Sequence, residues 1–326
     1  MNRFEFASPS SVESAVQLLG PNAVALAGGT DLLSLLKDGV LKPERVVSLK
    51  GIPDLTGIED RGDQGVRIGA LVTVEELMEN PVIRERYPAL AQAAEGIHSP
   101  QIRAMGTVGG DLCQRPRCWY FRSGYGLLAQ QDGKSMVEEG DNRYHAILGN
   151  EGPAKFVNPS SFAPALIALG AQVVIQGPNG RRTVAVADFF RTPQAEGERE
   201  YDLASDEVLV EIVVPPANGK RSAVYEVRQR EALDWPLAAA AVALEMDGGT
   251  VKSARIVLGH VAPTPWPAEA AAQALAGKTL DEAAAKAAGE AAVQGARPLS
   301  RNGYKVKLAQ VAVKRALLRA AGKEVA

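Results

Sequence analysis

The sequence is poor in the residues that bind metals and form disulfides. Its 326 residues include two cysteines, Cys113 and Cys118, and three histidines. Two cysteines so close together form no disulfide framework, and a structural zinc site needs four ligands at characteristic spacings. The scattered His98, His145 and His260 are therefore expected to be structural. The sequence predicts no metal site in this chain.

The sequence also lacks a strong charge bias and a long apolar run. Its formal net charge is −2, so no basic surface for nucleic acid is expected. No run of about 18 apolar residues that could span a membrane is present, and residues 1–5 do not have the pattern of a signal peptide. We therefore expect a cytoplasmic protein that binds neither nucleic acid nor membrane. No nucleophile stands in a pattern with a base, so no catalytic residue is assigned.

Two short glycine-rich stretches are the most informative feature of the chain. They are residues 27–32, AGGTDL, and residues 106–111, GTVGGD. Glycine lacks a Cβ atom and tolerates positive φ, so the backbone amides of such a loop can close on an anion such as a pyrophosphate. The alternative is that both stretches are ordinary tight turns. Neither matches the glycine spacing of a Rossmann loop or of a Walker loop.

Longer matches around these loops resemble a known family. Residues 101–112, QIRAMGTVGGDL, resemble the second flavin loop of the FAD-binding subunits of molybdenum hydroxylases, the xanthine dehydrogenase and carbon monoxide dehydrogenase family. Residues 26–33 resemble the first flavin loop of that family. Three further segments stand in the family's order: 163–171 (APALIALGA), 206–215 (DEVLVEIVVP) and 255–265 (RIVLGHVAPTP). The resemblance thus extends over nearly the whole chain.

The resemblance implies an α+β protein with a PCMH-type FAD-binding fold. Residues 1–216 are expected to form the FAD-binding domain, with α/β subdomains at about 1–57 and 58–216 and FAD between them. Residues 217–326 are expected to form a carbon monoxide dehydrogenase flavoprotein type C-terminal domain, with a three-stranded antiparallel sheet and helices. The residues themselves predict only a mixed α/β chain with a boundary near 215–219, PPANG.

Local patterns predict individual elements. Ser10 with Glu13, and Thr73 with Glu76, are typical of capping boxes at helix N-termini. Alternating and periodic patterns predict strands at 24–26, 45–49 and 66–70, hairpins at 172–176 with 183–186 and at 237–245 with 250–258, and helices at 32–37, 280–293 and 299–321.

The resemblance also implies which residues bind FAD. The backbone amides of 27–30 and 107–111 are expected to hold the pyrophosphate and ribityl region, and the hydroxyls of Thr30 and Thr107 to contact phosphate oxygens. Asp31 either orients the loop amides or contacts a flavin group, or it caps the helix that begins at Leu32. The full expected set comprises Leu26, Ala27, Gly28, Gly29, Thr30, Asp31, Leu32, Ile97, Thr107, Gly109, Gly110, Asp111, Ser161, Leu209 and Glu226.

Two of these positions depart from the family pattern. Ser161 stands where the family commonly has an aspartate that bonds to FAD. Glu226 stands where several relatives have a lysine near the isoalloxazine ring. The reversed charge at Glu226 leaves the redox tuning of the flavin and the identity of its electron acceptor open.

Residues 113–158 resemble an insertion found in the aldehyde oxidoreductase and 4-hydroxybenzoyl-CoA reductase branches, where four cysteines hold a four-iron cluster. Cys118 matches one of these cysteines. The other three positions correspond to Leu127 or Leu128, to Ser135 or Met136, and to Ala154. Such a cluster needs thiolate ligands, so none is expected in this chain. We expect the segment to be held instead by Trp119, Tyr120, Phe121, Leu127, Leu128 and Phe156.

The resemblance therefore implies the FAD-carrying electron-transfer subunit of a heteromeric molybdenum-dependent hydroxylase or dehydrogenase. Its partners would be a large subunit with molybdopterin and a small subunit with two-iron two-sulfur clusters. Electrons would pass from the small subunit through FAD to NAD, a quinone, oxygen or another protein. A stand-alone flavin oxidase and a structural subunit without cofactor remain the alternatives.

Overall fold

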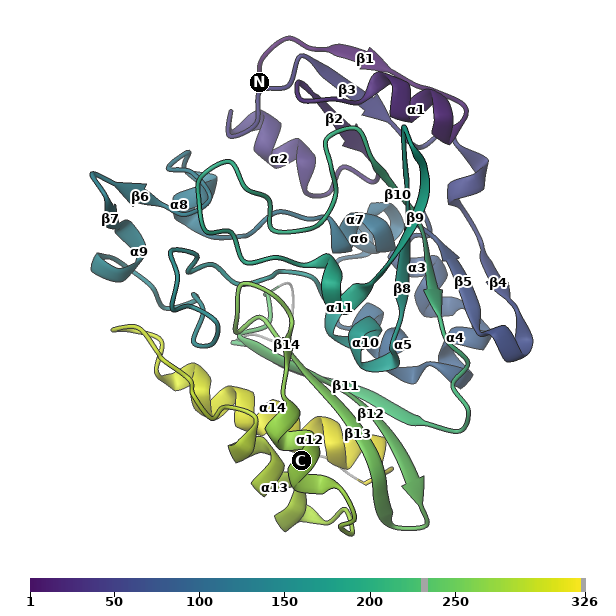
Figure 1. Ribbon diagram of the computed structural model, residues 1–326, viewed down its shortest axis with the longest axis vertical. Helices are drawn as coiled ribbons and strands as arrows, with labels where there is room; N and C mark the ends of the chain where they lie inside the picture. Colours follow the sequence, from purple (N-terminus) through teal and green to yellow (C-terminus); the bar gives the residue numbers. More distant parts are fainter. Residues whose placement is uncertain (230–233, 324–326) are drawn as a thin grey trace.

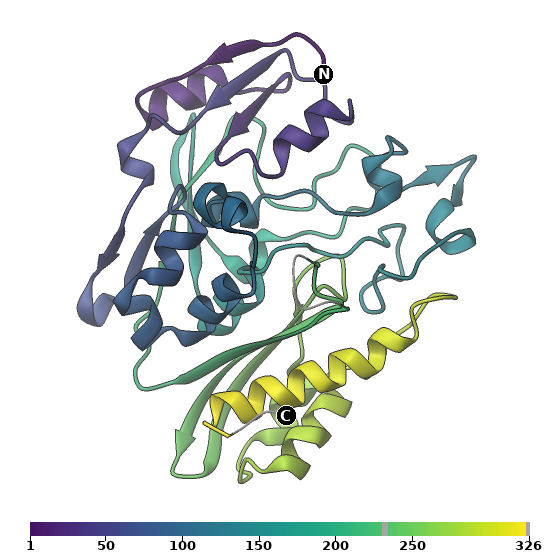
Figure 2. The same ribbon diagram turned by 180° about the vertical axis from the view of Figure 1, so that it is seen from behind.

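The computed structural model describes residues 1–229 and 234–323 of the chain (Figures 1 and 2). A small parallel sheet lies at one end, a five-stranded sheet in the middle, and a third sheet with the C-terminal helices at the other end. The expected C-terminal domain, 217–326, includes residues 230–233 and 324–326, which lie outside the described residues.

The N-terminal sheet has three parallel strands in the order β1-β3-β2. They are β1 (Glu5–Ala7), β3 (Arg45–Ser48) and β2 (Ala23–Leu26), joined through helices α1 (Val12–Leu18) and α2 (Leu32–Lys37). The expected strands and the helix at 32–37 are confirmed. The predicted cap at Ser10 is wrong by one residue: Ser11 has the extended backbone, and its side chain accepts from the amide of Ser14 at 3.2 Å.

The middle sheet has the order β4-β5-β10-β8-β9, with antiparallel neighbours throughout. Its strands are β4 (Ile58–Asp60), β5 (Val66–Gly69), β10 (Val208–Val214), β8 (Gln172–Gly177) and β9 (Gly180–Ala185). The hairpin of β8 and β9 was predicted, although Val186 begins helix α11 (Val186–Phe189) rather than ending the strand.

Short helices pack against this sheet and enclose a large apolar core around Ile68, Leu77 and Ile212. The predicted capping box of Thr73 and Glu76 is present at the start of α3. The helices are α3 (Val74–Glu79), α4 (Pro81–Arg86), α5 (Pro88–Glu95), α6 (Pro100–Met105), α7 (Val108–Leu112) and α10 (Ala163–Leu169), and two 3₁₀ turns lie at Pro53–Leu55 and Gly62–Gln64.

The C-terminal sheet has four antiparallel strands, not the three that were expected. Strands β11 (Arg221–Val227), β12 (Ala238–Asp247) and β13 (Thr250–Gly259) are long, and the additional strand β14 (Trp266–Pro267) pairs two residues with the end of β13. A Trp-Pro pair carries no alternating pattern that could have predicted this strand.

Three helices accompany the C-terminal sheet: the first and the last pack on one face of it, and the middle one packs against those two helices. Figure 2 shows the longest helix lying along the sheet. The three helices are α12 (Glu269–Leu275), α13 (Glu282–Ala291) and α14 (Tyr304–Ala320). The last two lie inside the predicted ranges 280–293 and 299–321 and begin later than predicted. Helix α13 starts after Asp281, whose side chain accepts from the amide of Ala284 at 2.7 Å.

The inserted segment, residues 113–158, extends as an arm at the left of Figure 1. It contains α8 (Trp119–Arg122), β6 (Gln130–Gln131), β7 (Lys134–Ser135) and α9 (Met136–Glu139). Its apolar core comprises Cys118, Phe121, Leu127, Leu128, Ala154 and Phe156 together with Leu35 of α2, and Tyr120 packs at its edge. The predicted contacts are confirmed, and the ring of Trp119 packs edge-on against Tyr120, Tyr144 and His145 of the same segment.

Among the described residues, none of the helices combines the length and the apolar character that crossing a membrane requires.

Candidate functional site

The two glycine loops lie against each other although 73 residues separate them in the chain. The first loop follows β2, and the second leads from α6 into α7. A Cβ atom added to Gly28 would lie 1.8 Å from the carbonyl oxygen of Met105 and 3.2 Å from the Cα atom of Gly106. No other residue fits here, because the clash is with backbone rather than with a movable side chain. Gly28 thus allows direct contact between the two loops.

The first loop presents a row of free amides. Within residues 1–229 and 234–323, the N–H groups of Gly28, Gly29, Thr30 and Asp31 have no hydrogen-bond acceptor. Gly29 has a φ of +80°, which L side chains adopt only with strain. Successive amides that turn in this way form a concave anion site.

The second loop uses its amides internally. Val108 donates to the carbonyl of Val72, and Gly109 donates to that of Ala70, each at 2.9 Å. The amide of Gly110 donates to the side-chain oxygen of Thr107 at 3.1 Å. Asp111 donates its amide to the carbonyl of Thr107 at 2.8 Å. The amides of 108–111 therefore already have acceptors within the protein, and the binding of the cofactor by the amides of 107–111 stays a prediction.

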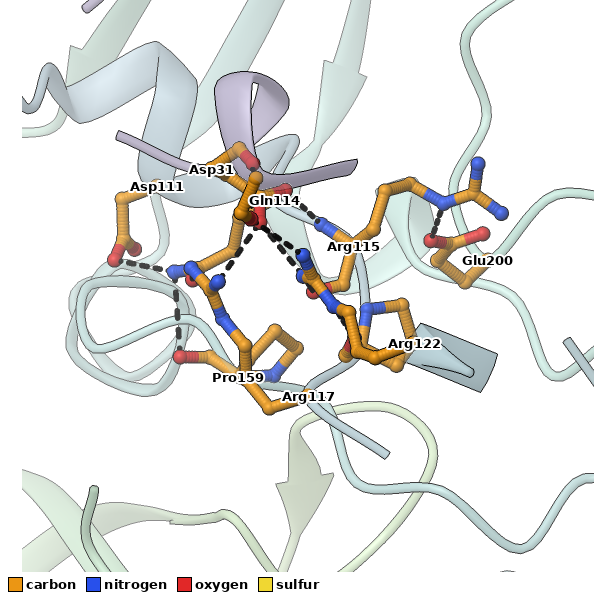
Figure 3. Close-up of polar contacts among 10 residues, drawn as sticks. Asp31, Asp111, Gln114, Arg115, Arg117, Arg122, Pro159 and Glu200 are labelled. Carbon is orange, nitrogen blue, oxygen red and sulfur yellow. Dashed lines mark hydrogen bonds and ion pairs between the residues drawn. The ribbon is translucent and has the colours of Figure 1, made fainter. Parts of the chain in front are cut away.

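The side chain of Asp111 also makes its hydrogen bonds to other residues of the protein. Its carboxylate accepts from the hydroxyl of Ser160 and from the amides of Ser161 and Phe162 at 3.2 and 3.1 Å. It also accepts from Nε2 of Gln114 at 2.8 Å, as Figure 3 shows. Burial raises the pKa of Asp111 to about 6, and the bonds from Ser160 and the two amides oppose that rise. Asp111 thereby fixes the chain that leads into α10.

Asp31 lies at the centre of an arginine cluster (Figure 3). Its carboxylate accepts from Arg122 at 2.6 Å, from Arg117 at 2.9 Å and from the backbone amide of Arg115 at 2.8 Å. The side chain of Arg115 pairs with Glu200. Asp31 makes no side-chain bond to the start of α2, so the capping alternative is wrong.

Two adjoining cavities surround the loops. The first, here called the loop cavity, has a volume of about 360 Å³ and follows the first loop, β2 and the start of β10. The second, the Ile97 cavity, has a volume of about 270 Å³ and lies between α6, α7 and the chain around residue 235. Both are lined by Thr30, Asp31, Thr107, Gly110 and Gln114. The cavities therefore meet where the two loops meet.

The structure brings most of the predicted site residues to these cavities. The loop cavity is lined by residues 27–32, Thr107, Gly109, Gly110 and Leu209. The Ile97 cavity is lined by Ile97, Asp111 and Ser161 in addition to the shared residues. Leu26 and Glu226 line neither.

Glu226 is buried in an ion pair with Arg228. Burial raises the pKa of its carboxyl, and the charge of Arg228 opposes the rise. Arg228 rather than Glu226 lines the Ile97 cavity, and its Nη2 also donates to the carbonyl of Gly96 at 2.6 Å. The reversed charge at position 226 is thus compensated beside the cavity.

Sequence reasoning missed the polar residues that the inserted segment contributes. Gln114 lines both cavities, Arg115 lines the loop cavity and Arg117 lines the Ile97 cavity. All three lie in residues 113–122, CQRPRCWYFR, between or beside the two cysteines. The density of arginines directly after a glycine loop was the available signal.

Comparison with known proteins identifies the family. Residues 2–217 match the family model described as the FAD binding domain in molybdopterin dehydrogenase, and residues 223–320 match the carbon monoxide dehydrogenase flavoprotein C-terminal domain. The chain belongs to the FAD-binding subunits of the molybdenum hydroxylases.

Relatives of this subunit family match along nearly their whole length. The chain is 35% identical to the carbon monoxide dehydrogenase medium chain of Hydrogenophaga pseudoflava, covering 97% of this chain and 96% of the relative. It is 32% identical to the aldehyde oxidoreductase FAD-binding subunit of Escherichia coli K12, covering 89% of each. Carbon monoxide dehydrogenase and aldehyde oxidoreductase, which the sequence resemblance named, are therefore both represented.

Solved structures of the family have the same fold. Carbon monoxide dehydrogenase from Hydrogenophaga pseudoflava, in a form that lacks the Mo-pyranopterin moiety, superposes with a TM-score of 0.76 at 35% identity. Quinoline 2-oxidoreductase from Pseudomonas putida 86 superposes with a TM-score of 0.77 at 26% identity. Each comparison covers 98% of both chains.

Proposed function

We propose that this chain binds FAD across the loop cavity and the Ile97 cavity and transfers electrons from an iron–sulfur subunit to an external acceptor. The observation that carries the proposal is the row of amides at 28–31, which find no acceptor in the described part of the chain and lie where the two cavities meet. These amides are the donors for the pyrophosphate, and the hydroxyl of the exposed Thr30 adds another donor.

The residues around the loops fit such a ligand in charge as well as in shape. Arg115, Arg117 and Arg122 carry three positive charges, and Asp31 and Glu200 balance two of them. A buried pyrophosphate needs neutral donors and a modest excess of positive charge, because an unpaired ionic group is costly to bury. The cluster leaves that excess of one charge beside the first loop.

The proposal gives the two loops different tasks. Residues 27–32 contact the ligand directly, whereas Thr107, Gly109, Gly110 and Asp111 hold the second loop in the position that supports them. Ile97, Ser161 and Leu209 contribute walls of the cavities. When bound, FAD supplies the one-electron and two-electron chemistry, while the protein supplies position and electrostatics.

Partners with the remaining cofactors complete the proposed enzyme. The relatives are medium chains or FAD-binding subunits by name, and we propose one large molybdopterin subunit and one small subunit with two-iron clusters as partners. The domain division at 1–216 and 217–326, with subdomains at 1–57 and 58–216, belongs to the proposal. Each of the three main sheets takes all its strands from one of these ranges, which supports the division.

A cytoplasmic location is also part of the proposal. Both cysteines are free thiols, Cys118 buried and Cys113 partly buried, as is usual in a reducing compartment. Fractionation of the source cells, with the partner subunits detected in the same fraction, tests the location.

The flavin content of the purified full-length chain tests the central claim. We expect one FAD per chain from the visible absorbance, and copurification of the two partner subunits from the native source. A chain that takes up no FAD on reconstitution contradicts the proposal and favours a structural subunit. Bleaching of the flavin by a substrate in the absence of partners favours the stand-alone oxidase.

A further inference from the structure

A buried ion pair contributes to the wall of the Ile97 cavity. Glu226 lies in β11 and Arg228 follows that strand directly; their side chains are 9% and 12% exposed. The carboxylate of Glu226 accepts from Nε of Arg228 at 3.2 Å and also from Nη2. Arg228 lines the cavity, whereas Glu226 does not. The cavity wall therefore presents a guanidinium whose charge is balanced by a residue outside the lining.

Arg228 also joins separate segments of the chain that line the cavity. Its Nη2 donates to the carbonyl of Gly96 at 2.6 Å, and its Nη1 donates to the carbonyl of Asp234. Gly96 precedes Ile97 and Asp234 precedes Trp235, and both of these neighbours line the cavity. One guanidinium thus fixes two parts of the lining relative to β11.

Gly96 leaves the space that the ion pair occupies. A Cβ atom added to Gly96 would lie 2.3 Å from Oε2 of Glu226 and 3.2 Å from Nη2 of Arg228. The backbone of Gly96 has an ordinary helical φ of −62°, so this position needs the absence of a side chain rather than an unusual conformation. The chain at the end of α5 is therefore packed directly against both charged groups.

The lining of the Ile97 cavity suits the ring of a cofactor. Its apolar side chains include those of Val74, Ile97, Ile102, Trp235 and Pro236. Cofactor rings usually bind in sites of this kind, which are mostly apolar and contain a few placed polar groups. The proposed FAD extends from the amides at 28–31 into this cavity, so its ring would lie beside Arg228.

The charge beside such a ring matters because reduction changes the charge of the ring itself. Two electrons and one proton convert the neutral oxidised flavin ring into a singly charged anion. In the proposed enzyme the electrons come from the iron–sulfur subunit and the proton comes from water. A positive charge nearby favours the reduced form and a negative charge favours the oxidised form, and this effect is large where little water screens it. Arg228 and Glu226 together contribute little net charge.

We propose that Glu226 and Arg228 are positioning residues that set the reduction potential of the bound flavin. The proposal rests on the proposed function and assigns a task to two residues of this chain. Arg228 fixes the lining of the cavity through the carbonyls of Gly96 and Asp234. Glu226 balances the charge that this task brings into the cavity wall, and so keeps the reduction potential lower than an unpaired arginine would.

The midpoint potential of FAD in the purified full-length chain tests the proposal without any measurement of turnover. It is measured by titration with dithionite in the presence of a reference dye. Glu226→Gln leaves the charge of Arg228 unbalanced, so we expect reduction to become at least about tenfold more favourable, which is a rise of about 30 mV for a two-electron couple. Arg228→Gln leaves the carboxylate of Glu226 unbalanced and should lower the potential.

Two further variants separate the effect of charge from an effect on the fold. The double variant Glu226→Gln/Arg228→Gln removes both charges, and its reduction equilibrium should return to within about twofold of the wild type. The control Glu211→Gln makes the same change in the ion pair of Arg67 and Glu211, whose side chains are 18% and 14% exposed and line neither the loop cavity nor the Ile97 cavity. It should leave the potential unchanged. Flavin content and thermal unfolding, measured on every variant, report whether each one folds.

Several results would overturn the proposal. They are equal potentials in the wild type and Glu226→Gln, and shifts of the same sign in the two single variants, which would show that the pair acts only through the fold. The single variants predict opposite shifts, so loss of FAD from one leaves the other decisive. Loss of FAD from both would show that the pair holds the cofactor rather than setting its potential. Failure of the wild type to hold FAD overturns the proposed function instead, and the flavin content distinguishes the two failures.

Discussion

The two glycine loops resemble each other in sequence and differ in what their backbones do. The first leaves the amides of 28–31 without acceptors among the residues that the structure describes, whereas in the second the amides of 108–111 all donate within the protein. The first loop follows the last residue of an edge strand, β2. The second packs on the end of β5. The carbonyls of Ala70 and Val72, which follow this strand, accept hydrogen bonds from the loop. A glycine motif therefore predicts a close approach of the backbone, but it does not predict whether the backbone approaches a ligand or another part of the protein.

The glycines of the two loops differ in the same way. Gly28 permits contact between loops, and Gly29 permits a left-handed turn. Gly109 permits packing on Ala70, whose Cβ atom would lie 2.8 Å from an added Cβ. We therefore expect a substitution in the first loop to impair a different property from the matching substitution in the second loop.

Loss of the contact between the loops should have the largest effect on FAD binding. In Gly28→Ala the new Cβ atom meets the carbonyl oxygen of Met105 at 1.8 Å, and a rigid backbone cannot give way. We expect FAD binding to weaken at least about 100-fold, measured by titration of the FAD-free chain. Gly303→Ala, which adds a Cβ atom with nothing within 4 Å, is the control. Full flavin occupancy in Gly28→Ala would show that the loops need not touch.

Removal of the Asp111 carboxylate should reduce stability rather than act on the ligand directly. Asp111→Ala leaves the hydroxyl of Ser160 and the amides of Ser161 and Phe162 without their acceptor. We expect the free energy of unfolding to fall by about 2–3 kcal/mol, measured by urea denaturation of the FAD-free chain. An unchanged midpoint would contradict the supporting role of the second loop.

The raised pKa of Asp111 also predicts how stability depends on pH. Burial moves this pKa from 3.8 to about 6, so the folded chain holds the proton more tightly than the unfolded chain. The contribution is complete below about pH 4 and is lost as the pH rises through 6. Relative to Asp111→Asn, the wild type should lose about 2 kcal/mol of unfolding free energy between pH 4 and pH 7. A constant difference between the two proteins across this range would refute the assignment.

A matched pair of threonines should give the smallest effects and the sharpest contrast. Thr107 caps α7, so Thr107→Ala should lower the free energy of unfolding by about 1 kcal/mol. Thr30 is exposed in the first loop, so Thr30→Ala should weaken FAD binding about fivefold and leave stability unchanged. Titration and denaturation of both variants measure the two effects. Equal changes in FAD affinity and in unfolding free energy for the two variants would contradict the different roles of the two loops.

The inserted segment, residues 113–158, shows which structural features the family resemblance can predict and which it cannot. The resemblance implies that Leu127 or Leu128, Ala154 and Cys118 correspond to cluster-ligand positions of the inserted segment. The structure gathers these residues into one apolar core with Phe156. The position at 135 or 136 lies outside that core. The convergence of these positions could be predicted from the family, but the packing that replaces the ligands could not.

The sequence by itself determined the family, the main strands and helices, and the place of the two loops. Those features depend on local periodicity, capping residues such as Thr73, and long motifs in a fixed order. Only the tertiary structure decided that Asp31 binds arginines instead of capping α2, that Glu226 is paired with Arg228, and which loop keeps its amides free. The physical reason is that a hydrogen bond or an ion pair depends on which distant segment lies within about 3 Å, and the local pattern does not specify that segment.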